Sequence, residues 1–265
     1  MRTWLLILLL PFLTPGWDAH SRLGLLGSKV AFTATPVALD PAHPSRRRVG
    51  RLTYLGGVQL KSPDPVFGGF SSLTVEGKAE RRHFTLLSDG GNIVRFDIDA
   101  AWRIGARRFA ELPSGPSTGW EKRERDSESM IVDPATGDLS IGFEYANAIW
   151  RYDHQLKVVR RHTALPAMHS WHENGGSEAM VRLPDGATIV FVETVLPKLR
   201  RTLQRSPGRI AIRFSSDPTV EPNSGFGFVY LPPKTMIRAT RRCCPMGASW
   251  CSIADSRCRS TSRPS

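Results

Sequence analysis

Short apolar runs of strand length recur along the middle of the chain and are separated by polar turns. Three segments share one order of apolar run, turn and second apolar run, and they begin at Gly68, Asp126 and Asn174. Runs this short, bounded by turn residues, are typical of strands rather than helices. The pattern therefore predicts three hairpins, formed by residues 72–75 with 84–87, 129–132 with 139–143, and 179–183 with 188–192.

The turns and the spacing of these segments indicate how the hairpins are arranged. Residues 133–138 and 184–186 are rich in Asp, Pro and Gly, the residues that tight turns require. A third apolar run follows two of the hairpins, at residues 92–96 and 148–152. Three strands repeated at a period of roughly fifty residues are typical of a β-propeller blade. The sequence therefore predicts an all-β protein, an incomplete propeller of about four blades.

The repeat aligns several acidic residues near the predicted axis. The aligned starts of the first strands are Ser71, Glu128 and Glu178, and the aligned ends of the second strands are Ser88 with Asp89, Glu144, and Glu193. The innermost strand of each blade lines the central channel, so these side chains are expected to form a ring there. Carboxylates held close together raise each other's pKa, which favours a bound cation or a shared proton. The alternative is that they bond to backbone amides or to neighbouring blades.

The same strings carry a family resemblance. Residues 126–153 and 174–193, with LTYLGGVQL and DPVFGGFSSL before them, resemble the phytase-like, esterase-like propeller proteins of Gram-negative bacteria. The resemblance covers residues 49–233. The positions that match the pattern of the family are Asp126, Glu128, Asn174, Gly176, Glu178, Pro184, Asp185 and Gly186. The resemblance implies hydrolysis of phosphate esters or other esters at an acidic channel mouth loaded with Ca²⁺.

The segment that enters the second blade combines both charges. Lys122, Arg123 and Arg125 are candidates for binding a phosphate group, together with Asn174. Carboxylates suit Ca²⁺ as ligands, and the candidate metal ligands are Asp126, Glu128, Glu144, Glu178 and Glu193. Glu128 and Glu178 are also the candidate catalytic residues. The mechanism that such a site would support is attack on a calcium-bridged ester by a metal-activated water. A network of salt bridges between blades is the alternative.

Three other motifs are weaker candidates. Residues 115–119 fit GxSxG, but a nucleophile elbow needs a strand before it and a helix after it, and this stretch reads as a surface loop. His169 and His172 could hold a metal, although the surrounding Pro and Gly favour a loop. Residues 89–92 could form a cation loop, but a hairpin turn is the commoner use of this pattern.

The two ends of the chain differ from its middle. Residues 1–19 read as a signal peptide, with an apolar run too short to span a bilayer, so we expect a periplasmic or secreted protein with no stable membrane span after removal of the signal. Residues 20–48 read as a lead-in to the propeller domain at residues 49–234. Residues 49–60 are expected to give one or two strands, and an N-terminal strand commonly completes the last blade of a propeller. Residues 209–214 and 225–231 are expected to form a fragmentary fourth blade.

The repeated pattern of apolar runs and polar turns ends after Lys234. All four cysteines lie in residues 235–265, without the paired spacing of a zinc site, and so do six arginines and one aspartate. A family member would continue with another blade, so we hypothesise a one-base deletion at about Lys234 and a disordered, out-of-frame tail. The nucleotide sequence of the gene tests this.

The tail carries part of the net charge of +12. The remaining basic residues are spread over presumed turns without interleaved aromatics, which argues against a nucleic-acid partner. We expect a monomer that takes a small-molecule or phosphate-ester substrate. Two functions follow from the sequence: an exported, divalent-metal-dependent phosphoesterase or esterase, or a non-catalytic periplasmic propeller that binds a ligand or partner.

Overall fold

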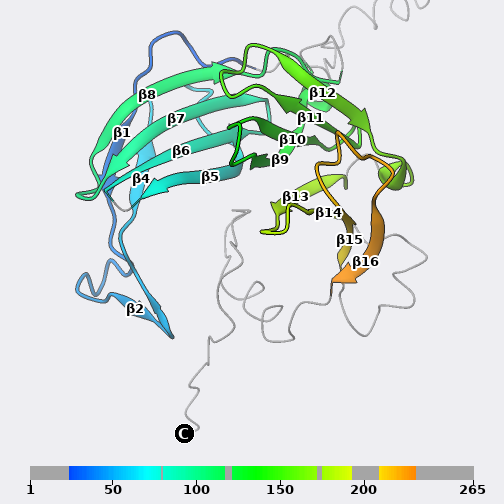
Figure 1. The fold of residues 1–265 in the computed structure, drawn as a ribbon. Helices are drawn as coiled ribbons and strands as arrows, with labels where there is room; N and C mark the ends of the chain where they lie inside the picture. Colours follow the sequence, from blue (N-terminus) through cyan, green and yellow to red (C-terminus); the bar gives the residue numbers. More distant parts are fainter. Residues whose placement is uncertain (1–23, 79, 117–120, 172–174, 193–208, 231–265) are drawn as a thin grey trace, which may run out of the picture.

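A computed structural model describes residues 24–78, 80–116, 121–171, 175–192 and 209–230. The predicted signal peptide, the tail from Thr235, Asn174 and Glu193 lie outside these residues. Within them, the fold is all-β and propeller-like, with three four-stranded antiparallel sheets, as the repeat predicted. The sheets fan out around a common line where their first strands meet (Figure 1). No helix in this part of the chain is long and apolar enough to cross a membrane.

Each sheet is a blade whose strands follow one another outward from the axis. Blade 1 contains β5 (Phe70–Lys78), β6 (Arg81–Ser88), β7 (Asn92–Asp99) and β8 (Ile104–Glu111). Blade 2 contains β9 (Ser127–Val132), β10 (Leu139–Phe143), β11 (Ala148–Tyr152) and β12 (Val159–Ala164). Blade 3 contains β13 (Ser177–Arg182), β14 (Thr188–Val192), β15 (Arg209–Phe214) and β16 (Phe226–Tyr230).

The assignment of residues 209–214 and 225–231 to a fourth blade is wrong. Strand β15 pairs with β14 along Thr188↔Phe214, and β16 pairs with β15, so both strands complete blade 3. Sixteen residues separate the end of β14 from the start of β15, at 193–208. Residues 193–208 therefore separate two strands of the same blade, whereas the prediction had treated this stretch as the boundary between two blades.

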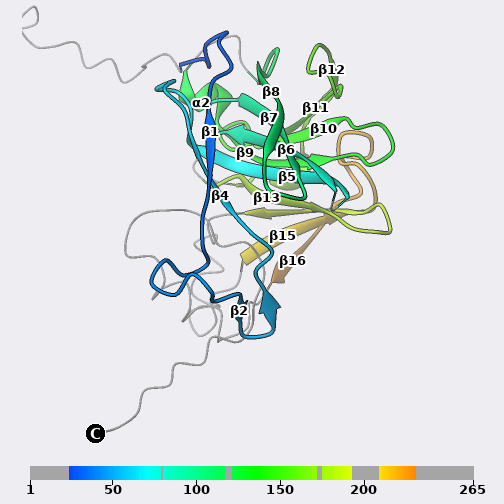
Figure 2. The same cartoon turned by 90° about the vertical axis from the view of Figure 1, so that its left-hand side faces the viewer.

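The N-terminal part forms two small sheets. Strand β1 (Thr33–Pro36) pairs with β4 (Val58–Lys61), and β2 (Arg48–Val49) pairs with β3 (Leu52–Thr53). The β2–β3 hairpin projects away from the blades in both views (Figures 1 and 2). The predicted strands within residues 49–60 are thus present, and β4 extends beyond them to Lys61. The structure has two helical turns, α2 (Lys122–Arg125) and the 3-10 helix η1 (Pro166–Met168), in its described part.

The hydrophobic core lies between the sheets. Leu87 and Ile93 of blade 1 pack against Leu139 and Ile141 of blade 2. The other face of blade 2 packs on blade 3, where Ile149, Val190 and Phe214 meet. The outer face of blade 1 packs against the N-terminal segment through Phe32. Burial of side chains this large stabilises the fold by roughly 1.5–3 kcal/mol each, so contacts between blades contribute substantially to stability.

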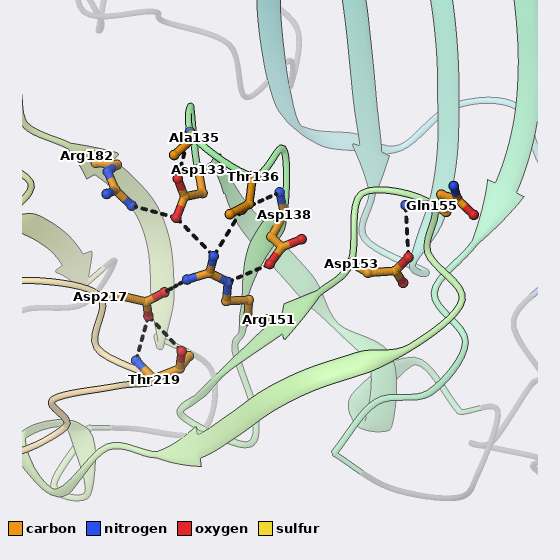
Figure 3. Close-up of polar contacts among 10 residues, drawn as sticks. All are labelled: Asp133, Ala135, Thr136, Asp138, Arg151, Asp153, Gln155, Arg182, Asp217 and Thr219. Atoms are coloured by element: carbon orange, nitrogen blue, oxygen red, sulfur yellow. Dashed lines mark hydrogen bonds and ion pairs between the residues drawn. The ribbon is translucent and has the colours of Figure 1, made fainter.

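A partly buried arginine adds a polar link between blades 2 and 3 (Figure 3). Arg151 on β11 donates to Asp133 at 2.9 Å and to Asp138 at 3.1 Å, both in the turn between β9 and β10. It also donates to Asp217 at 2.6 Å, which follows β15 in blade 3. Arg182 on β13 of blade 3 also forms an ion pair with Asp133, at 3.5 Å. Two arginines and three aspartates therefore connect the turns of the two blades.

Candidate functional site

The inner strand of each blade carries a β-bulge near its start. In blade 1, Phe70 and Ser72 pair with consecutive residues of β6, which leaves Ser71 as the extra residue. Glu128 is the extra residue of β9 and Glu178 that of β13, by the same register shift. The sequence alignment of these three positions is therefore confirmed. A bulge redirects a side chain away from the regular alternation of the strand, and bulges are frequent beside active sites.

Serine hydroxyls join the inner strands next to these bulges. Ser71 donates to the carbonyl of Ser127 at 2.6 Å, so β5 is tied to β9. Ser129 donates to the carbonyl of Ser177 at 2.8 Å, so β9 is tied to β13. Ser127, Ser129 and Ser177 are all buried. Hydrogen bonds between neighbouring inner strands hold the bulged residues in fixed relative positions along the axis.

The residue before each inner strand is glycine in two blades and aspartate in one. The amide of Asp89 donates to the carbonyl of Gly69 at 2.9 Å, and the amide of Glu144 donates to the carbonyl of Asp126 at the same distance. By register, Gly176 holds this position in blade 3. Blade 2 is thus the blade in which this position, the bulge and the end of the second strand all carry carboxylates.

These three carboxylates meet at one point. Asp126, Glu128 and Glu144 each place an oxygen within 4.8 Å of the others. Asp126 is 4% exposed, and the other two are half-buried. Burial, followed by the charges of Asp126, Glu178 and Glu144, raises the pKa of Glu128 to about 8. Burial also raises the pKa of Asp126, against the opposing effect of Lys122. Both shifts have the cause expected for carboxylates crowded in a poorly solvated place.

Helix α2 brings a cation to the edge of this cluster. The ammonium of Lys122 lies 3.2 Å from a carboxylate oxygen of Asp89 in blade 1 and 3.9 Å from Oδ1 of Asp126. Partial burial lowers the pKa of Lys122, but the carboxylates of Asp126, Asp89 and Glu128 outweigh it and raise the pKa. A reciprocal capping box between Glu121 and Glu124 fixes the start of this short helix. Lys122 therefore stays charged beside the carboxylates.

The donor set fits a hard divalent cation. Oδ1 of Asp126 is buried and has no hydrogen-bond partner among the described residues, and its ion pair with Lys122 is long, at 3.9 Å. A buried carboxylate oxygen without a partner is costly unless a cation or a proton compensates it. Carboxylate oxygens from three residues are the ligands that Ca²⁺ and Mg²⁺ prefer. The cluster can hold such an ion, or it can share protons among its carboxyl groups.

The remaining predicted site residues that the structure describes lie outside the cluster of three carboxylates. Glu178 is exposed and lies outside the 4.8 Å cluster, although its charge still raises the pKa of Glu128. Arg125 is buried and donates to the carbonyl of Leu112 at 2.8 Å, away from the carboxylates. Arg123 is exposed on α2. Asn174 and Glu193 are outside the described residues.

The weaker motifs add no second centre in this part of the chain. Residues 89–91 connect β6 to β7 as a turn, which confirms the hairpin interpretation. Ser117 of the GxSxG stretch and His172 lie outside the described residues. Sequence reasoning did not identify Asp89 as the partner of Lys122. The alignment of Asp89 with Glu144 at the ends of the second strands was the signal that could have placed Asp89 beside the acidic cluster.

The fold and this cluster define an all-β, propeller-like protein with an acidic centre beside its axis. Residues 65–212 match the phytase-like family, described as having the esterase-like activity of phytase. The chain belongs to this family. A search of the curated proteins finds no match. Among solved structures, a luciferin-regenerating enzyme matches at 12% identity and a TM-score of 0.34, over 52% of this chain. The match spans 43% of that structure's chain.

Proposed function

We propose that the chain hydrolyses esters, of phosphate or of carboxylic acids, with a divalent cation held by Asp126, Glu128 and Glu144. The observation that carries the proposal is the convergence of these carboxylates beside the axis, with a buried oxygen of Asp126 that has no hydrogen-bond partner among the described residues. Membership of the phytase-like family supports the reaction class. Ca²⁺ is the cation we propose, because an all-oxygen donor set with half-buried, adjustable carboxylates suits its flexible coordination.

The neighbouring side chains have complementary roles in this proposal. A bound cation would supply positive charge that polarises the ester and lowers the pKa of a nearby water. Lys122 lies at the rim of the cluster, where its ammonium can donate to an oxygen of the substrate. Glu178 is exposed on the adjacent inner strand and can accept a proton from water there. These groups come from α2, β9 and β13, so one substrate would touch two blades.

Cation binding is the first test. The full chain, freed of metal with a chelator, is titrated with Ca²⁺ and then Mg²⁺ by isothermal titration calorimetry. Asp126→Asn and Glu144→Gln should each weaken Ca²⁺ binding at least tenfold, because each removes a charged ligand. Asp185→Asn is the matched control, since this aspartate lies in an exposed turn of blade 3. Equal affinity in all four proteins would refute the proposed ligand set.

Turnover is the second test. Model phosphate esters and carboxylate esters are assayed with the full chain, with and without Ca²⁺. Cation-dependent release of product that is lost in Asp126→Asn supports hydrolysis at this centre. Saturable Ca²⁺ binding without turnover of either ester class would instead identify a non-catalytic propeller whose cation serves binding or stability.

A further inference from the structure

A row of polar residues crosses blade 1 on the face that looks toward blade 2. Thr74 on β5 pairs with Thr85 on β6, Thr85 pairs with Arg95 on β7, and Arg95 pairs with Arg108 on β8. Residues paired directly across antiparallel strands lie on the same face of a sheet. Two hydroxyls and two guanidinium groups therefore stand side by side. Two like charges in direct cross-strand pairing are destabilising unless another group compensates them.

Arg95 has little compensation within the described part of the chain. It donates through Nη1 to the carbonyl of His154 in blade 2 at 2.6 Å, while its Nε is buried without an acceptor. Burial, and then the charge of Arg108, lowers its pKa, against Glu76 and Asp153. No ion pair involves Arg95 or Arg108 among these residues. A half-buried guanidinium with an unused donor calls for an anionic acceptor.

A cavity of about 320 Å³ lies against this row, between blades 1 and 2. Its lining includes Thr85, Arg95 and Arg108 of blade 1, with Val132 and Leu139 of blade 2. The volume falls within the range of small-molecule pockets, at the lower end. Val132 ends β9, whereas Glu128 lies near the start of that strand, so the cavity and the acidic cluster lie toward opposite ends of the blades.

The other charged residues around the cavity compensate the two arginines only in part. Asp97 is held by Arg81, at 2.9 Å from its Nε, and by His83 at 2.5 Å. Arg107 extends from the other face of β8, where its guanidinium lies over the ring of Phe32 at 5.4 Å. Glu76 is the remaining carboxylate in the lining; its side chain is exposed, and its charge compensates Arg95 in part. Arg95 and Arg108 therefore retain positive charge that no ion pair within the described residues neutralises.

We infer that this cavity between blades binds a phosphate group, with Arg95 and Arg108 as its charged donors and Thr85 as a neutral one. A phosphate offers several strong acceptor oxygens, which match the fork of donors that arginine presents. Its charge would relieve the repulsion across the Arg95–Arg108 pair. The apolar wall of Val132 and Leu139 suits the carbon skeleton of a phosphomonoester. This inference does not rest on the proposed function, because no residue of the acidic cluster contributes to the cavity.

Phosphate binding is tested on the full chain in a chelator, which removes any metal-bound phosphate from the measurement. Inorganic phosphate and phosphoserine are titrated separately, and binding is followed by calorimetry and by the Nε–H signals of arginine in ¹⁵N NMR spectra. Tighter binding of phosphoserine would identify a phosphomonoester as the ligand, and equal binding would identify the free anion. Saturable binding that shifts the Arg95 signal is expected. No saturation by either compound up to 10 mM, roughly the weakest affinity of functional interest, would overturn the inference.

Variants assign the binding to this cavity. Arg108→Ala should weaken phosphate binding at least tenfold, while Arg103→Ala, an exposed arginine directly before β8 that does not line the cavity, should leave it unchanged. Arg95→Lys keeps the positive charge but loses the planar set of donors that a guanidinium presents. Lysine is chosen because complete removal of the Arg95 side chain would also break its hydrogen bond to blade 2. Arg95→Lys should weaken binding with little change in thermal stability. Equal affinity of the Arg103 and Arg108 variants would place the phosphate elsewhere.

Discussion

The guanidinium of Arg151 lies 2.6 Å from a carboxylate oxygen of Asp217, although the two residues belong to different blades. The same group also binds Asp133 and Asp138, and the side chain of Arg151 is 14% exposed. Three carboxylates thus share one largely buried guanidinium, and Arg182 is a second, more distant cation for Asp133 alone. Removal of one partner from a buried ion cluster leaves charges without compensation, which costs more than the pairing itself gains.

Replacement of Arg151 should therefore destabilise the fold strongly. We expect Arg151→Met to lower the free energy of unfolding by about 3 kcal/mol or more. Arg151→Lys should recover only part of this loss, because an ammonium cannot reach three carboxylates as a planar fork does. Urea unfolding followed by circular dichroism measures both effects.

A matched arginine serves as the control for that experiment. Arg213 also bonds an aspartate at 2.6 Å, but Asp185 is more than half exposed. Arg213→Met should change the free energy of unfolding by less than about 1 kcal/mol, as for exposed ion pairs generally. Similar losses in the two variants would mean that the Arg151 cluster does not connect the blades energetically.

Much of the fold was predictable because the first three strands of blades 1 and 2 carry a clear apolar pattern. The predicted run at 84–87 lies within β6, and the predicted run at 139–143 coincides with β10. The outer strands β8 and β12 were not predicted. Their sequences IGARRFAE and VRRHTA are mostly exposed, so little apolar periodicity was available to reveal them.

The sequence predicted which positions belong to the candidate site, but it did not predict which way their side chains point or which residues they contact. Alignment of the repeats placed Glu128 and Glu178 at equivalent bulges, which the register confirms. It could not show that Arg125 turns inward to Leu112, since a charged residue in a short helix gives no sign of its direction. Nor could it show that Lys122 reaches Asp89 in another blade, because that contact depends on how the blades pack.

Lys122 and Arg123 are adjacent on α2 but differ in their surroundings. Lys122 contacts two carboxylates at the rim, whereas Arg123 is exposed. In steady-state assays with a phosphate ester, Lys122→Ala should raise KM by about tenfold, since a charge-assisted hydrogen bond contributes roughly 1.5–3 kcal/mol. Arg123→Ala should leave KM within twofold. A larger effect at Arg123 would assign substrate binding to that side chain instead.

Gly176 has no room for a side chain beside the acidic cluster. A Cβ at this position would lie 2.5 Å from the carbonyl oxygen of Glu144, which is backbone and cannot move freely. Gly176→Ala should therefore displace Glu144, weaken Ca²⁺ binding, and lower the free energy of unfolding by about 2 kcal/mol. Calorimetry and urea unfolding measure the two effects.

Gly186 is the comparison for that variant. It has a positive φ of 88° in a turn, and a Cβ there would meet nothing within 4 Å. Gly186→Ala should cost about 1 kcal/mol from backbone strain alone and leave Ca²⁺ affinity unchanged. If Gly176→Ala also keeps its affinity, the position of Glu144 is not critical for the cation.

The raised pKa of Glu128 predicts an unusual dependence of stability on pH. Burial and three neighbouring carboxylates raise this pKa from 4.5 to about 8, so the folded protein holds a proton that the unfolded chain releases within this window. A raised folded-state pKa gives stability that is fully present below pH 4.5 and is lost as pH rises through 8. In a chelator, urea unfolding should therefore show stability falling between pH 5 and 8.

Glu128→Gln should remove most of this slope, because the amide stays neutral at every pH. Ca²⁺ should have the opposite effect on the wild-type protein, since it binds the ionised carboxylates and its affinity rises as they lose their protons. The wild-type stability at pH 8 should then increase with Ca²⁺, and that of Glu128→Gln should increase less. An unchanged slope in Glu128→Gln would assign the titration to another group, and an equal response to Ca²⁺ would exclude Glu128 from the ligands.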